Sequence, residues 1–450
     1  MSPQQTLVIS DLHLGARRAD PSLDAALISF VDHYLVEPGP WRLIIAGDGI
    51  DFVHAGLEAT GPERDHCEAR AVHTLERIVN AHLPVFSALA RFVSAGHELI
   101  FLKGNHDAEL HWDAVQSRLR QLFEELGAGE GSRDRILVHP WFYYVEDELY
   151  VEHGNQYDPL CSFEHVLWPV DADHRIAAPL SHVALQTFSG LIHRLDAHAV
   201  DRWRLPDFLR WLRSLEPALI WRSAGAYLGC SQWLGRLKRR LAKSTEEARV
   251  RHQARLRELV AHFRLRPEAV ERLDRLRHRP AGHRLISGFR MLFFDQLLLA
   301  GATAALLMVL LVLGGPLWPR LATGGGLLIG AALLSQLWLR WRSVDPAPAL
   351  AERAAKVADL VGVPYVVFGH SHAPLMQPLP APGSAYVNSG SWTHVGATGL
   401  THVVVTHGAA RNAELRRWNP REGTAEAVAS WPKVHASDRL PSPGMRTLPA

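Results

Sequence analysis

The chain has 450 residues, of which 47% are hydrophobic and 21% are charged, and its formal net charge is +2 at pH 7. These values are typical of a globular protein with room for two or three domains. Its three cysteines, Cys67, Cys161 and Cys230, are odd in number and widely spaced, which excludes a disulfide framework and a C-x-x-C zinc pair. The apolar run Thr6–Ser10 is too short for a signal peptide and leads directly into Asp11, so we expect no such peptide.

Residues 1–155 alternate strand-like runs with helix-like runs, which predicts the first part of an α/β domain. The expected helices are Ser22–Val36, His66–Val93 and Trp112–Leu126. The expected strands are Thr6–Ser10, Arg42–Ala46, Glu98–Leu102, Ile136–Val138, Trp141–Val145 and Leu149–Glu152.

Residues 156–290 contain no clear strand, and they become strongly basic after Arg236. One apolar set falls at helical spacing, namely Leu256, Leu259, Val260 and Phe263. This pattern predicts one or two amphipathic basic helices. Beside a membrane segment, clustered Lys and Arg usually face anionic lipid. A solvated basic face is the alternative, and without other nucleic-acid motifs we expect no nucleic-acid partner.

Two uncharged apolar stretches follow, Gln296–Pro319 and Leu321–Leu339. Each has about 20 residues, which is the length that spans a hydrocarbon core. Gly314–Pro316 and Pro319 supply a break between them. We therefore expect a transmembrane hairpin over residues 291–342, and the alternative is a buried helical pair in a soluble core.

Strand-like sequence returns over residues 343–425, which predicts the second part of the α/β domain. The expected strands are Pro364–Phe368, Ser384–Asn388, Thr401–Thr406 and Ala413–Trp418. The domain is thus split in the sequence by the helical and apolar insertion. We expect residues 426–450, which are rich in Pro and Ser, to form a disordered tail.

Five short blocks of metal-ligand residues occur at the ends of expected strands. They are Asp11-Leu12-His13, Gly47-Asp48-Gly49-Ile50-Asp51, Gly104-Asn105-His106-Asp107, His153-Gly154 and Gly369-His370-Ser371-His372. Ligands at strand ends converge on one edge of a sheet, where open α/β folds build their sites. Carboxylate, imidazole and amide groups together suit two transition-metal ions. Taken singly, each residue could instead be a turn residue, a helix N-cap or a solvated histidine.

The order of these blocks resembles the calcineurin-like metallophosphoesterase superfamily, whose pattern is D-x-H, G-D-x-x-D, G-N-H-D, a later histidine and G-H-x-H. The resemblance covers roughly residues 5–155 and 360–420. It implies a four-layer α/β/β/α sandwich and a centre of two divalent ions, with manganese, iron or zinc favoured by imidazole ligands. The implied ligands are Asp11, His13 and His372 for one ion, Asn105, His153 and His370 for the other, and Asp48 as the bridge.

The resemblance also assigns roles to residues beside the ligands. His106 would contact the phosphate and the leaving group, as a general acid or an oxyanion stabiliser. Asp51 and Asp107 would orient the ligands. Residues 388–392 resemble the N-x-G-S turn of the family, for which we expect packing under the site. Two metal ions would clamp a phosphoryl group, lower the pKa of a bridging water and stabilise the attacking and leaving oxygens.

Residues 11–14 and the His153 block further resemble the UDP-2,3-diacylglucosamine pyrophosphatases, which act at a membrane surface on a lipid-bearing nucleotide. Those enzymes also carry a helical insertion before the last two metal histidines. They typically have arginine where this chain has His106, and they lack a transmembrane hairpin of this kind. The insertion here is also much longer, so the resemblance does not fix the substrate.

We therefore expect a membrane-anchored, metal-dependent phosphoesterase that hydrolyses a phosphodiester, phosphomonoester or pyrophosphate bond, with a lipid-linked nucleotide as one candidate substrate. The alternatives are an enzyme of soluble nucleotides or phosphoproteins and an inert scaffold, which lost ligands would signal. Because ligands precede and follow the hairpin, both parts of the site must lie on one side of the membrane. Arginines flank the hairpin at positions 284, 290, 340 and 342, whereas the turn carries only Arg320. The positive-inside rule then places the catalytic domain in the cytoplasm.

Overall fold

The computed structural model describes residues 5–15, 20–57, 67–182, 245–280, 294–340, 346–396, 398–408 and 411–431. The chain divides into two compact units. The first comprises Met1–Pro179, Arg240–Arg279 and Ala347–Ala450, and the second comprises Leu180–Arg239 and Pro280–Pro346. The first unit therefore unites the two predicted parts of the α/β domain with a basic portion of the insertion.

Seven strands of the first unit form one sheet, in the order β12-β11-β10-β1-β2-β3-β4. Their bounds are β1 Gln5–Ile9, β2 Trp41–Ala46, β3 Glu98–Leu102, β4 Ile136–His139, β10 Thr401–Thr406, β11 Asn412–Asn419 and β12 Thr424–Trp431. Strands β1 to β4 are parallel, whereas β10 pairs antiparallel with β1. The two ends of the chain therefore share one sheet.

Five strands form the second sheet, in the order β5-β6-β7-β9-β8. Their bounds are β5 Phe142–Val145, β6 Leu149–Glu152, β7 Tyr365–Phe368, β8 Leu375–Pro378 and β9 Ala385–Asn388. Strand β6 precedes the insertion and β7 follows it, yet they pair in parallel from Leu149 opposite Tyr365. This pairing joins the two parts of the domain across the insertion.

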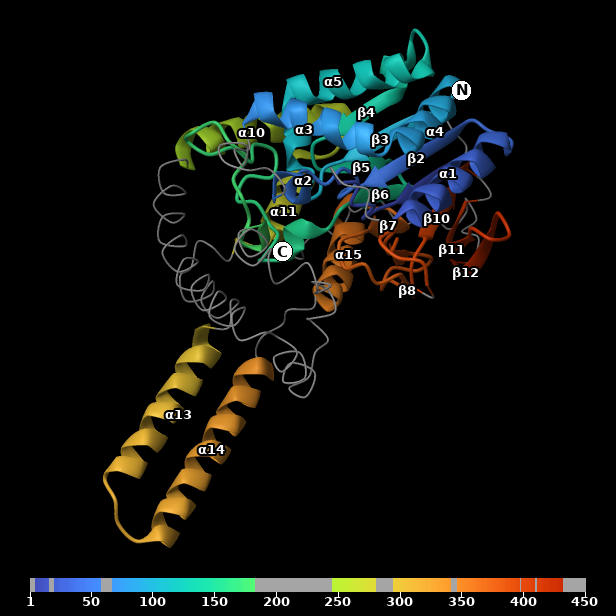
Figure 1. The fold of residues 1–450 in the computed structure, drawn as a ribbon. Helices are drawn as coiled ribbons and strands as arrows, with labels where there is room; N and C mark the ends of the chain where they lie inside the picture. The colour runs from blue at the N-terminus through green and yellow to red at the C-terminus, as the bar shows by residue number, and fades with distance from the viewer. Residues whose placement is uncertain are drawn as a thin grey trace, which may run out of the picture. The chain divides into compact units, whose positions relative to one another are not determined.

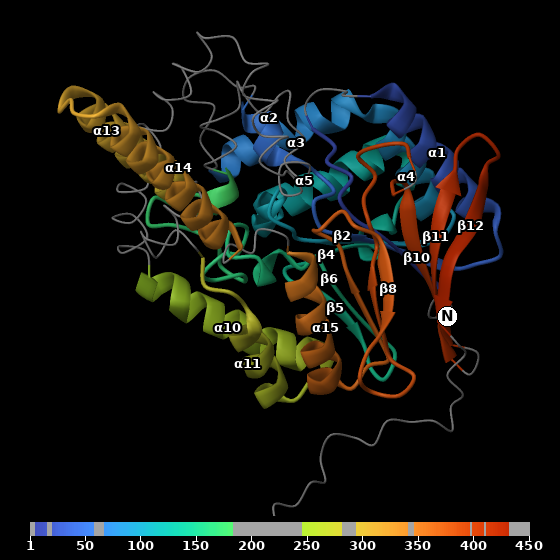
Figure 2. The same ribbon diagram turned by 90° about the horizontal axis from the view of Figure 1, so that it is seen from below.

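Helices cover the outer face of each sheet in the first unit. Their bounds are α1 Pro21–Val36, α2 Phe52–Leu57, α3 Glu68–Ala81, α4 Leu83–Ser94, α5 Asp113–Phe123, α10 Thr245–Phe263, α11 Pro267–Leu276 and α15 Ala347–Val361. Figure 1 shows α1, α3, α4 and α5 grouped along the seven-stranded sheet. Figure 2 shows α10, α11 and α15 grouped beside the five-stranded sheet.

The alternation of side chains along the strands produces three buried cores. On β1, Leu7 and Ile9 pack under the first group of helices, whereas Val8 packs between the sheets with Val367 of β7. On the far side of β7, Val366 packs with the helices of the second group. The cores therefore separate four layers, helices, sheet, sheet and helices, as the α/β part of the prediction required.

Helices α10 and α11 confirm the predicted basic amphipathic helices. Leu256 and Leu259 of α10 are each 5% exposed and belong to the core beneath the five-stranded sheet. The apolar face therefore packs on protein. Exposed arginines on these helices pair with acids on the same helix, as Arg249 does with Glu246. Two further pairs are Arg251 with Glu247 and Arg275 with Glu271.

Three expectations about the secondary structure were wrong. The single helix predicted over His66–Val93 is two helices, α3 and α4, because the chain breaks at His82 and Pro84 begins a new helix. Strand β8 was not predicted from its sequence, Leu-Met-Gln-Pro. The disordered tail was predicted to begin at residue 426, but β12 continues to Trp431, held by pairing to β11 rather than by burial.

In the second unit, helices α13 (Phe294–Val312) and α14 (Leu317–Arg340) lie side by side as a hairpin (Figure 1). The Ser335 hydroxyl donates to Gln296 Oε1 at 2.7 Å between them. Pro319 and Arg320, which were expected in the turn, lie instead in the first helical turn of α14. Arg320 donates to the Leu311 carbonyl near the end of α13 at 3.0 Å. The flanking arginines at positions 284, 290 and 342 lie outside the described residues.

Only one of the described helices meets a membrane-span criterion of length and composition, over Leu317–Trp338. The apolar part of α13, Leu298–Val312, is shorter. Both helices expose large apolar side chains, such as Met308 at 62% and Leu333 at 64%. The two apolar stretches singled out in the sequence are therefore helices, and one of them meets the length and composition criterion.

Candidate metal centre

The ends of five strands place the predicted site residues on two facing sheet edges. Asp11, Asp48 and Asn105 follow β1, β2 and β3, which are parallel neighbours in the first sheet. His153 and His370 follow β6 and β7, which are parallel neighbours in the second sheet. Parallel strands end at one edge, so the loops after them converge. The expectation of convergence at strand ends is therefore correct for both sheets.

Five of the seven predicted ligands adopt the left-handed backbone conformation. Their φ angles are 54° for Asp11, 48° for His13, 51° for Asp48, 68° for His370 and 54° for His372. This conformation is uncommon for residues other than glycine, and it persists where surrounding contacts impose it. Here the loops are tied together by backbone hydrogen bonds, including the His13 amide to the Asp48 carbonyl at 2.9 Å.

The side chains of these loops meet in two overlapping groups. Asp11, His13 and His372 bring one potential ligand atom each to within 4.8 Å of one another, and so do Asp11, Asp48 and His153. Within them, Asp11 Oδ1 lies 2.9 Å from His372 Nε2. Because the two groups share Asp11, they lie next to each other, and each has the side chains to hold a cation.

Asp48 lies between residues assigned to different ions. Its Oδ2 atom is 3.2 Å from His153 Nε2 and 3.9 Å from His13 Nε2. Its other oxygen, Oδ1, accepts a hydrogen bond from the His106 amide at 2.8 Å. This backbone contact fixes the carboxylate, with Oδ2 directed toward both imidazoles.

Several buried ligand atoms have no hydrogen-bond partner among the described residues. These atoms are His13 Nε2, His153 Nε2 and Asn105 Oδ1. In each histidine the other ring nitrogen is engaged, His13 Nδ1 with Asp51 at 2.8 Å and His153 Nδ1 with the Ala46 carbonyl at 2.9 Å. Metal-binding histidines are usually held in this way, which leaves the remaining nitrogen for the ion. The donor set therefore fits a metal centre.

His370 is held differently from the other histidines. Its Nε2 atom lies 3.0 Å from Asp158 Oδ2, so Nδ1 is the nitrogen left for a metal. Its ring centroid is 5.1 Å from that of His153, and its amide donates to Asp11 Oδ2 at 3.1 Å. The sequence analysis missed Asp158. Its place shortly after His153 was the available signal, but no spacing rule singles it out.

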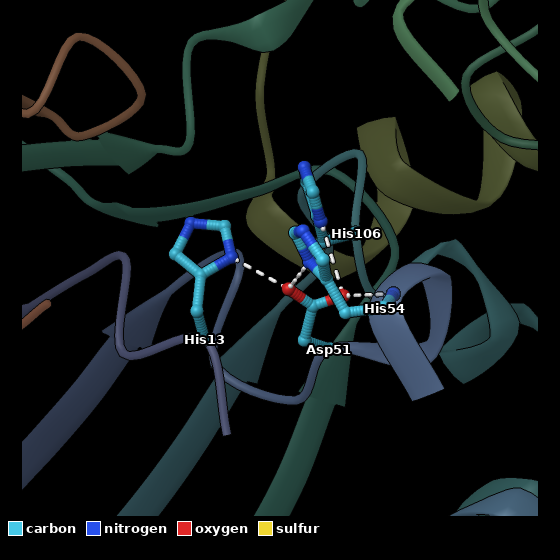
Figure 3. Close-up of side chains that lie close together, drawn as sticks. All are labelled: His13, Asp51, His54 and His106. Atoms are coloured by element: carbon cyan, nitrogen blue, oxygen red, sulfur yellow. Dashed lines mark hydrogen bonds and ion pairs between the residues drawn. The ribbon is translucent and has the colours of Figure 1, made fainter. Parts of the chain in front are cut away.

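Asp51 connects three imidazoles, which Figure 3 shows. Its Oδ2 atom lies 2.8 Å from His13 Nδ1 and 2.6 Å from His54 Nδ1, and its Oδ1 atom lies 3.1 Å from His106 Nδ1. The His54 ring stacks on that of His106 with centroids 5.5 Å apart. Asp51 therefore has the orienting position expected of it, and His54 is a second residue that the sequence analysis missed.

Asp107 orients the backbone rather than a ligand side chain. Its two oxygens accept hydrogen bonds from the Gly49 amide at 2.9 Å and the Gly104 amide at 2.5 Å. These bonds tie the loop that carries Asp48 to the loop that carries Asn105. Burial and the charge of Asp48 raise the pKa of Asp107 to about 7.

The turn at residues 388–392 packs beneath the site, as expected. Asn388 donates to the Gly369 carbonyl at 2.7 Å. The Ser389 hydroxyl lies 2.8 Å from that of Ser10, which donates to Asp11 Oδ2. This network therefore supports the loops on which Asp11 and His370 lie.

The electrostatics of the cluster favour bound cations. Burial opposes ionisation of Asp48, but the His153 and His106 rings outweigh it and hold the pKa of the carboxyl well below its usual range. Burial lowers the pKa of His153, but Asp48 and Asp11 outweigh it and raise this pKa to about 10. In the same way Asp51, by hydrogen bond and by charge, outweighs burial and raises the pKa of His13 to about 9. Without metal these imidazoles therefore hold protons, which metal binding displaces.

Residues 5–222 match the family model of the calcineurin-like phosphoesterases. This segment of the chain belongs to that family. Its members are metal-dependent phosphoric ester hydrolases with a dinuclear divalent metal centre. No curated protein matches the chain. The matched segment contains the residues from Asp11 to His153, whereas His370 and His372 lie beyond it and join the site through β7.

Gly104 provides a test of how tightly the loops are packed. A Cβ atom at this position would lie 2.2 Å from Asp48 Oδ1 and 2.7 Å from the Asp48 amide nitrogen. We expect Gly104→Ala to displace the Asp48 carboxylate and to weaken metal binding by at least about ten-fold, the scale at which disturbed supporting contacts act. Equilibrium dialysis with a divalent metal measures this change.

Gly15→Ala is the matched control, because a Cβ atom there meets nothing within 4 Å and the backbone is not left-handed. It should bind metal like the parent protein. Equal metal affinity for both variants would mean that the loop can relax around the added methyl group, contrary to the tight packing described.

Proposed function

We propose that the chain is a dinuclear phosphoesterase anchored in a membrane, with its catalytic domain in the cytoplasm. One observation carries the catalytic part of this proposal. The His13 Nε2, His153 Nε2 and Asn105 Oδ1 atoms are buried without a hydrogen-bond partner, beside carboxylates that the field of the site keeps ionised. Buried polar groups in this state are explained by ions that they bind.

Seven residues form the metal centre in this proposal. Asp11, His13 and His372 hold one ion, Asn105, His153 and His370 hold the other, and Asp48 bridges them. The position of Asp48 Oδ2 between His13 and His153 supports the bridge. Imidazole and carboxylate ligands favour manganese, iron or zinc. When bound, the two ions supply a clamp for the phosphoryl group and charge stabilisation for the displacement.

The protein groups around the ligands determine how a phosphoester is positioned. Asp51 fixes the ring of His106 through Nδ1. We assign His106 Nε2 the contact with the phosphate and with the oxygen of the leaving group, to which it transfers a proton. Asp158 fixes His370, and Asp107 fixes the two loops. All seven proposed ligands and His106 are present, which disfavours the inert scaffold.

The substrate is a phosphodiester, a phosphomonoester or a pyrophosphate, and a lipid-linked nucleotide fits a membrane location. The exposed apolar faces of α13 and α14 support this location. An enzyme of soluble nucleotides or phosphoproteins, tethered by the hairpin, is the second candidate. The order of the ligands along the chain requires an even number of crossings, because His370 and His372 must reach Asp11.

Asp48→Asn tests the dinuclear centre. The substituted amide is a poor bridge between two cations, so we expect loss of bound metal and a fall in bis-p-nitrophenyl phosphate hydrolysis of more than about a hundred-fold. Plasma mass spectrometry should find two ions per parent chain. The exposed Asp147, in the β5–β6 turn, gives the control Asp147→Asn, which should keep both properties. A fully loaded parent protein with one ion per chain would refute the bridge.

His106→Ala tests proton transfer to the leaving group. We expect the metal content to stay at the parent value and the rate on an alkyl phosphodiester to fall by about 10²–10⁴-fold, which is the usual range for acid–base assistance. His73→Ala, at a side chain that is 72% exposed, is the control. An unchanged rate on this poor leaving group would remove His106 from the mechanism.

The membrane topology can be tested by labelling single cysteines in a chain that lacks Cys67, Cys161 and Cys230. In intact cells an impermeant maleimide should label Leu313→Cys, in the turn between α13 and α14, and should not label Ser442→Cys, near the C-terminus. Alkaline carbonate should leave the protein in the membrane fraction. Labelling at the C-terminus would invert the orientation, and release by carbonate would exclude a spanning hairpin.

A further inference from the structure

His54 lies outside the five ligand blocks, yet it is adjacent to every other residue drawn in Figure 3. Its Nδ1 atom lies 2.6 Å from Asp51 Oδ2, and its ring stacks on the His106 ring with an angle of 17° between the planes. It also meets the His13 ring edge-on, with the ring centroids 6.5 Å apart. One residue therefore adjoins a proposed metal ligand, the proposed proton donor and the carboxylate between them.

The start of α2 places His54 in this position. The helix begins at Phe52, so Asp51 immediately precedes it and His54 is its third residue. An acid before a helix accepts a hydrogen bond from the amide of such a residue, and the His54 amide donates to Asp51 Oδ1 at 2.8 Å. The Asp51 amide donates to the Leu14 carbonyl at 2.8 Å. The Phe52 amide donates to the His106 carbonyl at 3.0 Å, so the start of α2 is joined to two loops of the site.

The Asp51 carboxylate accepts hydrogen bonds from the described residues on both of its oxygens. Oδ2 accepts from the Nδ1 atoms of His13 and His54, whereas Oδ1 accepts from His106 Nδ1 and from the His54 amide. An ionised carboxylate can only accept, so each of these Nδ1 atoms carries a proton. Because His54 donates to both oxygens, it opposes rotation of the carboxylate about the Cβ–Cγ bond.

The orientation of this carboxylate determines which nitrogen each neighbouring imidazole presents to the site. Because His13 Nδ1 donates to Asp51, Nε2 of the same ring keeps its lone pair for a metal ion. Because His106 Nδ1 is held by the other oxygen, Nε2 is the nitrogen that remains for the phosphoester. A carboxylate that turned would therefore release a metal ligand and the proton donor together.

We propose that His54 is a positioning residue, which fixes the Asp51 carboxylate so that one acid orients both a metal ligand and the proton donor. This inference rests on the proposed function and adds to it a residue that acts through Asp51 and not on the substrate. The action runs through Nδ1 and the amide of His54, and the stacked ring restrains the ring of His106. The His54 side chain is 46% exposed, so it can be replaced without opening a core.

Three substitutions of His54 separate the functions of its ring atoms. His54→Phe keeps an aromatic ring over His106 but removes the side-chain donor. His54→Asn puts an amide nitrogen close to the position of Nδ1, whereas His54→Gln puts one close to the position of Nε2. Because the proposed action runs through Nδ1, His54→Asn should keep the properties of the parent protein, and the other two variants should lose them.

The first measurement is the leaving-group dependence of the rate at saturating metal. His54→Phe and His54→Gln should lower kcat on an alkyl phosphodiester by about 10- to 100-fold, which is the scale for a disturbed orienting contact. The loss on bis-p-nitrophenyl phosphate should be smaller, because its leaving group needs little protonation. KM should stay near the parent value, since His54 does not contact the substrate. His73→Phe, at a side chain that is 72% exposed, is the control and should match the parent on both esters.

A double-mutant cycle tests whether His54 acts through Asp51. In an Asp51→Asn background, His54→Phe should cause little further loss, because effects that pass through one residue are not additive. Additive losses would overturn the proposal. Retention by His54→Gln with loss in His54→Asn would also overturn it, because Nε2 would then be the functional atom. Equal losses on both esters with a lowered melting temperature would assign His54 to the fold alone.

Metal binding separates failure of this inference from failure of the proposed function. Equilibrium dialysis of the full chain with manganese ions requires no hydrolysis. His54→Phe should weaken one of the two binding steps by about ten-fold, through His13, and His54→Asn should not. This result would support the inference even if no ester is hydrolysed. If the parent protein hydrolyses esters while His54→Phe keeps its metal affinity and its leaving-group dependence, the inference is wrong and the proposed function stands.

Discussion

The architecture of this chain depends on keeping several carboxylates ionised inside protein. Asp11, Asp48 and Asp51 are each at most 2% exposed and lie within one cluster. Burial alone would drive protons onto them, and imidazoles and backbone amides prevent this. The ionised carboxylates require cations close by, which are either protonated histidines or metal ions. Because Asp11 follows β1 whereas Asp48 and Asp51 follow β2, and the imidazoles come from both sheets, the strands must be in register before the charges can balance.

The need to bring these side chains together in one buried cluster also accounts for the left-handed backbone at five of the proposed ligands. These residues are Asp11, His13, Asp48, His370 and His372. Each turns the chain sharply after a strand, so that a side chain points back across the sheet edge. Conformations of this kind persist only where the surroundings impose them. The glycines differ in purpose. Gly47 has a φ of 82° and also lacks room for a Cβ atom, which would lie 2.5 Å from His153 Cγ. Gly104 and Gly369 are required for space alone, since a Cβ atom at Gly369 would meet the Asp11 carboxylate at 2.7 Å.

Much of this centre could be predicted from the sequence because its ligands are coded locally. Each block follows a strand-like run, and the residue types and their spacing within a block can be recognised from the sequence alone. Asp158 and His54 could not be found in this way, because their roles come from the partners that they contact in the fold. His54 matters through Asp51 and His106, and Asp158 matters through a residue more than two hundred positions away.

Strands, too, were predictable where the local sequence marks them and not where they depend on pairing with another strand. Buried strands such as β3 and β6 were predicted with correct ends, because continuous apolar runs mark them. Strand β12 lacks such a run, since five of its eight residues are exposed, and its strand conformation comes from pairing with β11. The break between α3 and α4 at His82 was visible only as Pro84, and the long helical pattern around it concealed the interruption.

The pairing of β1 with β10 determines how far the protein can fold during its synthesis. Gln5 pairs with Thr406, so the second neighbour of β1 leaves the ribosome 401 residues after Gln5 does. Until β10 is synthesised, one edge of β1 has no strand to pair with. The edge of β6 that pairs with β7 is likewise unpaired until β7 is synthesised. The apolar hairpin emerges before either partner does. During synthesis both sheets therefore remain incomplete after the hairpin has emerged. Because the missing contacts join residues far apart in the sequence, we expect the α/β domain to complete its folding late and slowly.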